Sequence, residues 1–136
     1  MKGAATRVWV VSVPVTDFEK ALAFYRDLLG MKVQLDGRMF NWMELGPDEP
    51  LCKIGLYEAK GEITRRPPIR TGITLDTDDI GEFHSRLSSK GVKFSLPPEK
   101  QPWGGIQADF LDVDGNTLSV VQDPGHYKYS MPQNPQ

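Results

Sequence analysis

The residues that could carry out chemistry are few and lie scattered along the chain. Cys52 is the single cysteine, and no base or helix start stands near it, so we do not expect it to act as a nucleophile. His84 stands inside a helical segment, where a histidine at the surface or at the edge of the core is the simpler interpretation than a ligand. The sequence contains no glycine-rich phosphate-binding motif.

Two charged segments resemble binding motifs without meeting their requirements. The segment 112–116, DVDGN, looks like a calcium loop, but its glycine stands at the fourth position instead of the sixth, and no glutamate follows at the twelfth. A hairpin turn is therefore the prediction for this segment. Arg65, Arg66 and Arg70 form a short basic patch, which we interpret as part of a solvated linker.

Length and charge limit the classes of partner. A chain of 136 residues predicts a single domain, and 16 Lys and Arg against 18 Asp and Glu leave a formal charge of -2, too balanced to attract nucleic acid. No apolar run approaches the ~18 residues of a membrane span, and the first residues do not form a signal peptide. One cysteine fits a reducing compartment. We therefore expect a cytoplasmic protein with neither a nucleic acid nor a membrane as its partner.

The first half of the chain predicts one strand, one helix and three further strands. Residues 7–15, RVWVVSVPV, are rich in β-branched residues and predict a strand. The segment 16–30, TDFEKALAFYRDLLG, predicts an amphipathic helix with Thr16 or Asp17 as its cap and Gly30 as its stop. Shorter extended runs follow near 31–36, 38–45 and 51–57.

The second half repeats this order after a linker over 59–70. An extended run at 71–77 precedes a helix over 79–90, with Asp79 as its cap and Gly91 as its stop. Strands follow near 92–95, 105–112 and 116–122. The two halves are therefore interpreted as copies of one unit, followed by a tail that is either disordered or an arm that wraps a partner.

Four segments resemble the vicinal oxygen chelate superfamily, which includes glyoxalases, bleomycin-resistance proteins and extradiol dioxygenases. They are VTDFEKALAFYRDLLGMKV, LDTDDIGEFHSRLSSKGVKF, QPWGG and DVDGNTLSVVQ. The resemblance covers residues 7–122 and implies an α+β fold, in which two tandem βαβββ modules form a curled mixed sheet around a cleft, usually in a homodimer. The modules would span about 5–58 and 71–122 of a single domain 1–136, with the linker at 59–70 and the tail at 123–136.

The resemblance also implies where a metal ion would bind, and this sequence departs from it there. Metal-dependent members usually take ligands from the first and the last strand of each module. These positions fall at Val10, Gly72, near Gly55 and at Ser119, which stands where DVDGNTLSVVQ usually has a glutamate. Because a divalent ion needs at least three good donors, we expect neither the standard metal site nor another cofactor.

Residues two apart in a strand share a face, so the residues at every second place from these four positions are predicted to face the implied cleft. The predicted ligand-binding residues are Trp42, Tyr57, Phe40, Glu44, Asp76, Gln107, Asp109 and Ser119, together with Trp103 in the QPWGG loop. The alternate residues are predicted to face the core: Trp9, Val11, Val13, Met43, Leu45, Ile54, Leu56, Ile73, Leu75, Ala108, Phe110, Leu118 and Val120.

These residues leave three functions open. Aromatic walls with a few polar anchors suit a small molecule, and carboxylates in excess over Lys53 favour an aromatic or cationic ligand, held without a metal. The second function is a lyase, an isomerase or epimerase, or a dioxygenase of the same superfamily, with a displaced metal site or with Glu44, Asp76 or Asp109 as acid or base. If the tail crossed the cleft, His126 could serve substrate or such a metal. The third is an accessory module for a partner protein.

Overall fold

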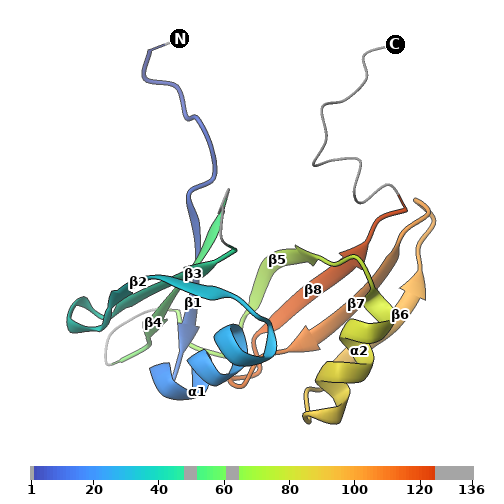
Figure 1. The fold of residues 1–136 in the computed structure, drawn as a ribbon. Helices are drawn as coiled ribbons and strands as arrows, with labels where there is room; N and C mark the ends of the chain where they lie inside the picture. The colour runs from blue at the N-terminus through green and yellow to red at the C-terminus, as the bar shows by residue number, and fades with distance from the viewer. Residues whose placement is uncertain (1, 48–51, 61–64, 125–136) are drawn as a thin grey trace. The chain divides into compact units, whose positions relative to one another are not determined.

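The computed structural model describes residues 2–47, 52–60 and 65–124, and the chain divides into two units, Met1–Ile69 and Arg70–Gln136. The division falls at the end of the predicted linker. Each unit consists of a four-stranded mixed sheet with a helix packed on one face (Figure 1). The α+β fold of two tandem βαβββ modules is therefore confirmed.

The first unit has the strand order β1-β4-β3-β2, with β1 parallel to β4. Its elements are β1 (Val10–Val15), α1 (Phe18–Leu22), the π-helix η1 (Ala23–Leu28), β2 (Lys32–Gly37), the 3-10 helix η2 (Arg38–Phe40), β3 (Trp42–Gly46) and β4 (Lys53–Glu58).

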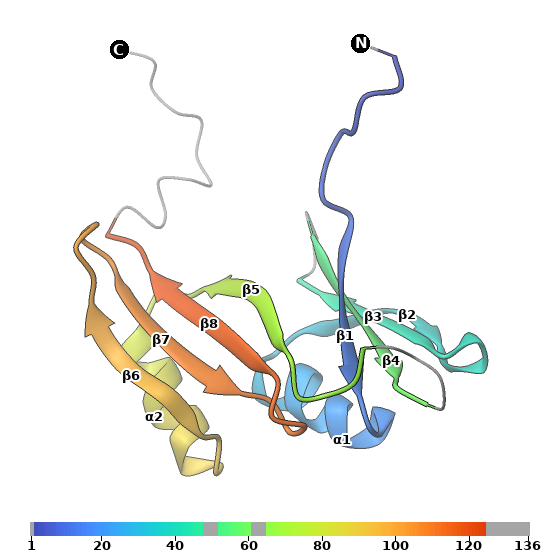
Figure 2. The same cartoon turned by 180° about the vertical axis from the view of Figure 1, so that it is seen from behind.

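The second unit repeats this topology with the order β5-β8-β7-β6, and β5 runs parallel to β8 (Figure 2). Its elements are β5 (Arg70–Asp76), α2 (Ile80–Ser89), β6 (Phe94–Lys100), β7 (Ile106–Leu111) and β8 (Thr117–Gln122). The same first-to-last parallel pairing in both units confirms the predicted repeat.

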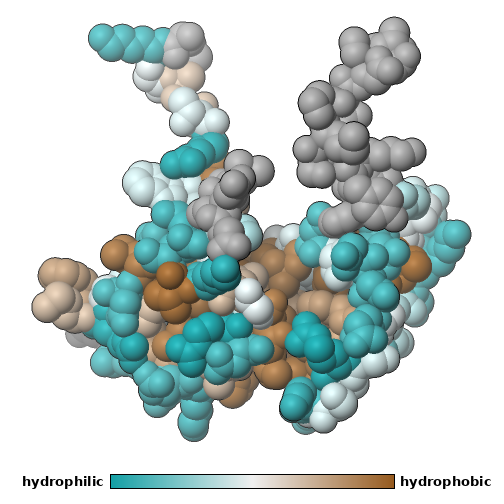
Figure 3. Space-filling model, in the orientation of Figure 1, coloured by the Kyte–Doolittle hydropathy of each residue, from teal (hydrophilic) through white to brown (hydrophobic). Residues whose placement is uncertain are grey.

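Each core lies between one face of a sheet and its helix. Most side chains predicted to face the core are buried: Val13, Met43, Leu45, Ile54, Leu56, Ala108, Phe110, Leu118 and Val120. Val11, Ile73 and Leu75 are only half-buried. In the second core Phe110 meets Phe83 with ring centroids 5.4 Å apart and Phe94 at 5.6 Å. Hydrophilic residues cover the outer sides of α1 and α2 (Figure 3).

The helices begin where the capping residues predict. The Asp17 carboxylate accepts a hydrogen bond from the Lys20 amide at 3.0 Å, and the Asp79 carboxylate accepts one from the Glu82 amide at 2.9 Å. Both carboxylates therefore satisfy a backbone donor that the first turn of a helix leaves without a partner.

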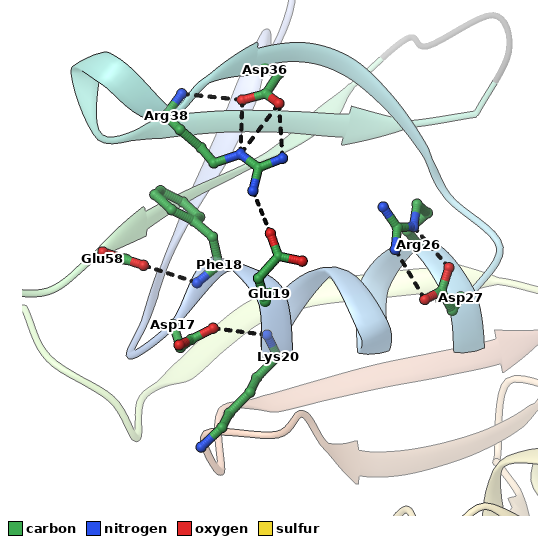
Figure 4. A network of polar contacts seen from close by, with 9 residues as sticks. All are labelled: Asp17, Phe18, Glu19, Lys20, Arg26, Asp27, Asp36, Arg38 and Glu58. Atoms are coloured by element: carbon green, nitrogen blue, oxygen red, sulfur yellow. Dashed lines mark hydrogen bonds and ion pairs between the residues drawn. The ribbon is translucent and has the colours of Figure 1, made fainter.

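The last strand of each unit reaches back to the start of the helix in that unit. Glu58 at the end of β4 accepts from the Phe18 amide at 2.9 Å (Figure 4), and Gln122 at the end of β8 accepts from the Ile80 amide at 2.8 Å. The Lys60 ammonium, and then the Phe18 amide, hold the pKa of the Glu58 carboxyl below its usual range. The duplicated contact fixes each helix against its sheet.

Replacing Glu58 tests this contact. Glu58→Ala removes the acceptor for the Phe18 amide, and we expect it to lower the free energy of unfolding by about 1 kcal/mol, or the melting temperature by roughly 4 °C. Glu58→Gln keeps an acceptor oxygen and should retain most of the stability. Thermal unfolding followed by circular dichroism measures both, and equal losses in the two variants would contradict the contact.

The first helix differs from the predicted α-helix after Leu22. The Leu29 amide donates to the Phe24 carbonyl at 3.0 Å, five residues back, so the second half of this helix is π-helical. The wider turn lets the neighbours Phe24 and Tyr25 both enter the core, at 5% and 0% exposure.

The Arg38 guanidinium joins this helix to η2, because it pairs with both Glu19 and Asp36 (Figure 4).

Two aromatic residues lie outside the strands in which they were predicted. The core prediction for Trp9 is wrong: β1 begins at Val10, and Trp9 before it is 60% exposed. The strand predicted over 38–45 begins only at Trp42, because Asn41 adopts a left-handed conformation with φ 58. Phe40 therefore lies in the preceding 3-10 helix and is 80% exposed.

Strand β6 is longer than predicted and ends at Lys100 instead of near residue 95. It continues through Pro97 and Pro98, which cannot donate to a strand ladder. This is tolerated because β6 is an edge strand, paired on one side with β7.

The hairpin turn predicted over 112–116 is confirmed. The buried Asp112 carboxylate accepts from the amides of Asp114 and Asn116 at 2.8 and 2.9 Å, and from the Asn116 side chain at 2.8 Å. The turn thus joins β7 to β8 through its own polar groups. In the described part of the chain, no helix is long and apolar enough to span a membrane.

Candidate functional site

The first sheet carries polar and aromatic side chains on the face away from α1. Along β3, Trp42 and Glu44 alternate with the buried Met43 and Leu45. The same alternation places Lys53, Gly55 and Tyr57 of β4 and Val10 and Ser12 of β1 on this helix-free face. Glu44 pairs with Gly55 across the strands, and Gly55 pairs with Ser12.

The Trp42 indole lies on the backbone of Gly55. A Cβ atom added at Gly55 would stand 2.3 Å from both Cη2 and Cζ2 of Trp42, so the ring occupies the space that any other side chain at this position would need. The indole Nε1 also donates to Glu44 Oε2 at 2.8 Å. A glycine beneath the ring and a carboxylate at its edge therefore hold the indole in place.

Lys53 neutralises the carboxylate that holds Trp42. Its Nζ atom donates to Glu44 Oε1 at 2.7 Å, and the Glu44 side chain is 12% exposed. The Lys53 ammonium, and then the Trp42 indole, hold the pKa of the Glu44 carboxyl below its usual range. Lys53 Nζ also lies 5.2 Å from the centroid of the Trp9 ring. Sequence reasoning missed this contact because it placed Trp9 in the core. The position of this aromatic residue close to the start of a strand was the signal that could have indicated an exposed ring.

The pKa of Glu44 gives the pH dependence of this cluster. Because the folded-state pKa lies below the unfolded value of 4.5, the carboxylate contributes its full stability above that pH and loses it as the pH falls through the folded pKa. At neutral pH we expect Glu44→Gln to be less stable than the wild type by about 1 kcal/mol. Urea unfolding should show this difference vanish in acid, and a difference that persists there would contradict the ionised pair.

The second sheet carries a corresponding polar group on its helix-free face. Asp109 Oδ1 accepts from the Ser119 hydroxyl at 2.7 Å and from the Gln107 amide nitrogen at 3.2 Å. Asp109 pairs with Ser119 across the strands, and Ser119 pairs with Thr74, which repeats the row Glu44, Gly55, Ser12 of the first unit. Among the described residues, no lysine or arginine forms a salt bridge with Asp109.

Within the described residues, the other predicted site residues are not part of the hydrogen-bonded groups around Glu44 and Asp109. Asp76 is exposed on β5 and pairs with Val121, one row from Ser119. The Trp103 ring lies over Gly105, where an added Cβ would stand 1.9 Å from Cζ3, and the side chain is 52% exposed. Tyr57 shares the first helix-free face, whereas Phe40 lies in η2 outside the strands.

The residues at the family's usual metal positions do not fit a metal ion. Val10 and Gly55 are neighbours, since Val10 Cγ2 lies 3.0 Å from a Cβ added at Gly55, but neither offers a side-chain donor. The Trp42 ring occupies the space that a ligand side chain at Gly55 would need. Gly72 also has no donor, and the Ser119 hydroxyl is engaged by Asp109. The convergence of all four positions stays a prediction.

A displaced metal site on Glu44 is not favoured either. Both oxygens of Glu44 accept hydrogen bonds, one from Trp42 and one from Lys53, and a metal ion would have to displace an ammonium group. No cluster of three or more His, Cys, Asp or Glu residues that could hold a metal ion occurs in the parts of the chain that the structure describes.

Among the described residues, the remaining reactive side chains form no hydrogen bond with Glu44 or Asp109. His84 is half-buried on α2, with its ring 4.6 Å from that of Phe94, as a histidine at the edge of the core should be. Cys52 is exposed just before β4. Arg65 and Arg66 are exposed, whereas Arg70 begins β5 and does not belong to the linker. His126 lies outside the described residues.

A duplicated βαβββ unit with a polar helix-free face on each sheet defines the class of this protein. The family model of the Glyoxalase/Bleomycin resistance protein/Dioxygenase superfamily matches residues 7–120. The chain therefore belongs to this superfamily, and the predicted resemblance is confirmed.

Three individual proteins are similar to this chain in sequence or in structure. A superfamily member from Sphaerobacter thermophilus is 34% identical, with a TM-score of 0.79 over 88% of this chain and 98% of that one. TnmS3, an antibiotic binding protein from Streptomyces, is 32% identical, with a TM-score of 0.76 over 88% of this chain and 97% of that one. A bleomycin resistance protein from Klebsiella pneumoniae is 26% identical over 82% of this chain and 89% of its own length.

Proposed function

We propose that this protein binds a small aromatic or cationic molecule without a metal ion and acts by sequestering it. The ligand would bind to the helix-free face of a sheet. Trp42 on the first sheet and Trp103 beside the second would each provide a flat apolar surface, and Tyr57 and the exposed Phe40 would add aromatic area in the first unit. Glu44, Asp76, Gln107, Asp109 and Ser119 would provide the polar contacts. Apolar surface with a few placed polar groups is typical of small-molecule sites.

The observation that carries this proposal is the position of Trp42. Its ring lies against Gly55, near a position where the resemblance implies a ligand side chain in metal-dependent members, and its Nε1 donates to Glu44 at 2.8 Å. An indole held in this way loses little conformational freedom when an aromatic ligand stacks on it. The arrangement favours recognition of a planar organic molecule over coordination of a metal ion.

Relatives support a binding function over a catalytic one. TnmS3, at 32% identity, is an antibiotic binding protein, and the relative from Klebsiella pneumoniae is a bleomycin resistance protein. We propose that the ligand of this chain is likewise an organic molecule that the protein removes from solution. We also propose a homodimer, as is usual in the superfamily, and a cytoplasmic location, which the lone Cys52 supports.

A titration tests the proposed function. The purified chain is titrated with planar aromatic compounds, neutral and cationic, with and without EDTA, while tryptophan fluorescence is recorded and the metal content is measured by elemental analysis. We expect saturable binding that the chelator does not change, and no stoichiometric metal. Turnover of a bound compound that requires nickel, zinc, iron or manganese would contradict sequestration and support an enzyme with a displaced metal site.

A further inference from the structure

We infer that Asp109 is the residue that recognises a positive charge on the ligand, and that the ligand joins a planar aromatic system to a protonated amine. This inference rests on the proposed function and names the class of molecule that the second sheet would take. Asp109 and Glu44 occupy equivalent positions in the two units. Asp109 pairs with Ser119 on β8, and Glu44 pairs with Gly55 on β4. Neither Ser119 nor Gly55, which stand at the implied last-strand positions, has a carboxylate.

The two carboxylates differ in what they already contact. Glu44 has an ammonium partner, because Lys53 Nζ lies 2.7 Å from its Oε1, and its second oxygen accepts from Trp42. Among the described residues, the donors to Asp109 are neutral: the Ser119 hydroxyl and the Gln107 amide, and both reach the same oxygen, Oδ1. Within the described residues, Oδ2 of Asp109 has no partner from the protein.

The charges around Asp109 favour a cation. Its Cα partner on β6 is Leu96, which brings no charge, and the next row along the sheet contains Asp76 and Glu99, paired with Val121 and Gln107. A ligand that covers Asp109 removes water from a carboxylate that forms no salt bridge with any described residue. Such burial is costly unless the ligand itself supplies the opposite charge.

An aromatic surface lies on the same face. Gly105, Gln107 and Asp109 alternate along one side of β7 and the residue before it, and the Trp103 ring lies over Gly105. Asp109 follows Gly105 after four residue steps of extended chain, which corresponds to about 13 Å between their Cα atoms. A molecule of drug size can therefore stack on Trp103, which is 52% exposed, while its amine reaches Asp109.

A matched pair of ligands tests this inference. Daunorubicin carries a planar ring system and a protonated amine, and N-acetyl-daunorubicin has the same rings without the charge. We expect the wild-type chain to bind daunorubicin about tenfold more tightly than its N-acetyl form in calorimetric or fluorescence titrations. Asp109→Asn should abolish this preference by weakening daunorubicin about tenfold, and should change the binding of the neutral compound less than about twofold.

The control is Asp78→Asn, which removes the same charge from an exposed turn before α2 and should keep the preference. The amide in Asp109→Asn is isosteric and keeps an acceptor for Ser119, and circular dichroism confirms that the variant folds. Equal binding of both compounds by the wild type, or a preference that survives in Asp109→Asn, would overturn the inference and leave the proposed function intact. Binding of neither compound would overturn both.

Discussion

Gly55→Ala should weaken the binding of a planar aromatic ligand about thirtyfold, because the loss of one stacking surface costs about 2 kcal/mol. The added methyl group would stand 2.3 Å from two ring carbons of Trp42, so the ring has to leave the sheet. The atoms that collide are at the far end of a side chain that can rotate, and the strand pairing is not affected. We therefore expect the free energy of unfolding to fall by only about 1 kcal/mol, chiefly from the lost bond to Glu44.

Two comparisons separate this effect from a general loss of structure. Gly81→Ala makes the same change in α2, where the nearest atom is the Asp79 carboxylate at 3.5 Å, and should leave binding unchanged. In a Trp42→Ala background, Gly55→Ala should have no further effect on affinity, because both changes remove the same surface. Additive losses in the double variant would show that Gly55 contributes in some way other than through Trp42.

Asp112→Ala should have the largest effect on stability, with a loss of about 3 kcal/mol and a melting temperature lower by roughly 10 °C. Asp112 is 6% exposed and accepts three hydrogen bonds, from the amides of Asp114 and Asn116 and from the Asn116 side chain. Removing the carboxylate takes this acceptor away from all three donors, two of which belong to the buried Asn116. Chemical denaturation at neutral pH measures the loss.

Val113→Ala is the matched control in the same turn. Val113 is 49% exposed, so its truncation should change stability by less than about 0.5 kcal/mol. A similarly small loss for Asp112→Ala would show that water replaces the carboxylate and that the turn does not hold β7 against β8. Stabilisation of the wild type by calcium that Asp112→Ala removes would make the segment a calcium site instead of a hairpin turn.

The order of elements could be predicted from the sequence because local signals mark each boundary. Asp17 and Asp79 cap their helices, and Gly30 and Gly91 end them with φ values of 82 and 89, which side chains rarely adopt. Features that depend on tertiary packing could not be predicted from the sequence. The π-helix after Leu22 has no signal in residue types, and the extension of β6 through two prolines follows only from its place at the edge of the sheet.

The candidate site could be predicted in part. Strand alternation, counted from the implied metal positions such as Gly55, placed Trp42, Glu44 and Lys53 on one face, as the structure has them. The contacts among them depend on the register between β3 and β4, which a single sequence does not specify. The misplacement of Phe40 has a visible cause, because asparagine is a residue that tolerates the left-handed conformation found at Asn41.

The central claim is that an indole platform on the first sheet, and not a metal ion, binds the ligand. The most direct measurement is a ¹H–¹⁵N spectrum of the indole groups of the three tryptophans, assigned with single Trp→Phe variants, during titration with daunorubicin in the presence of EDTA. The account predicts that the Trp42 signal shifts and saturates as the ligand is added. A Trp42 signal that stays unchanged at saturation, or one that shifts only after a divalent metal ion is added, would contradict it.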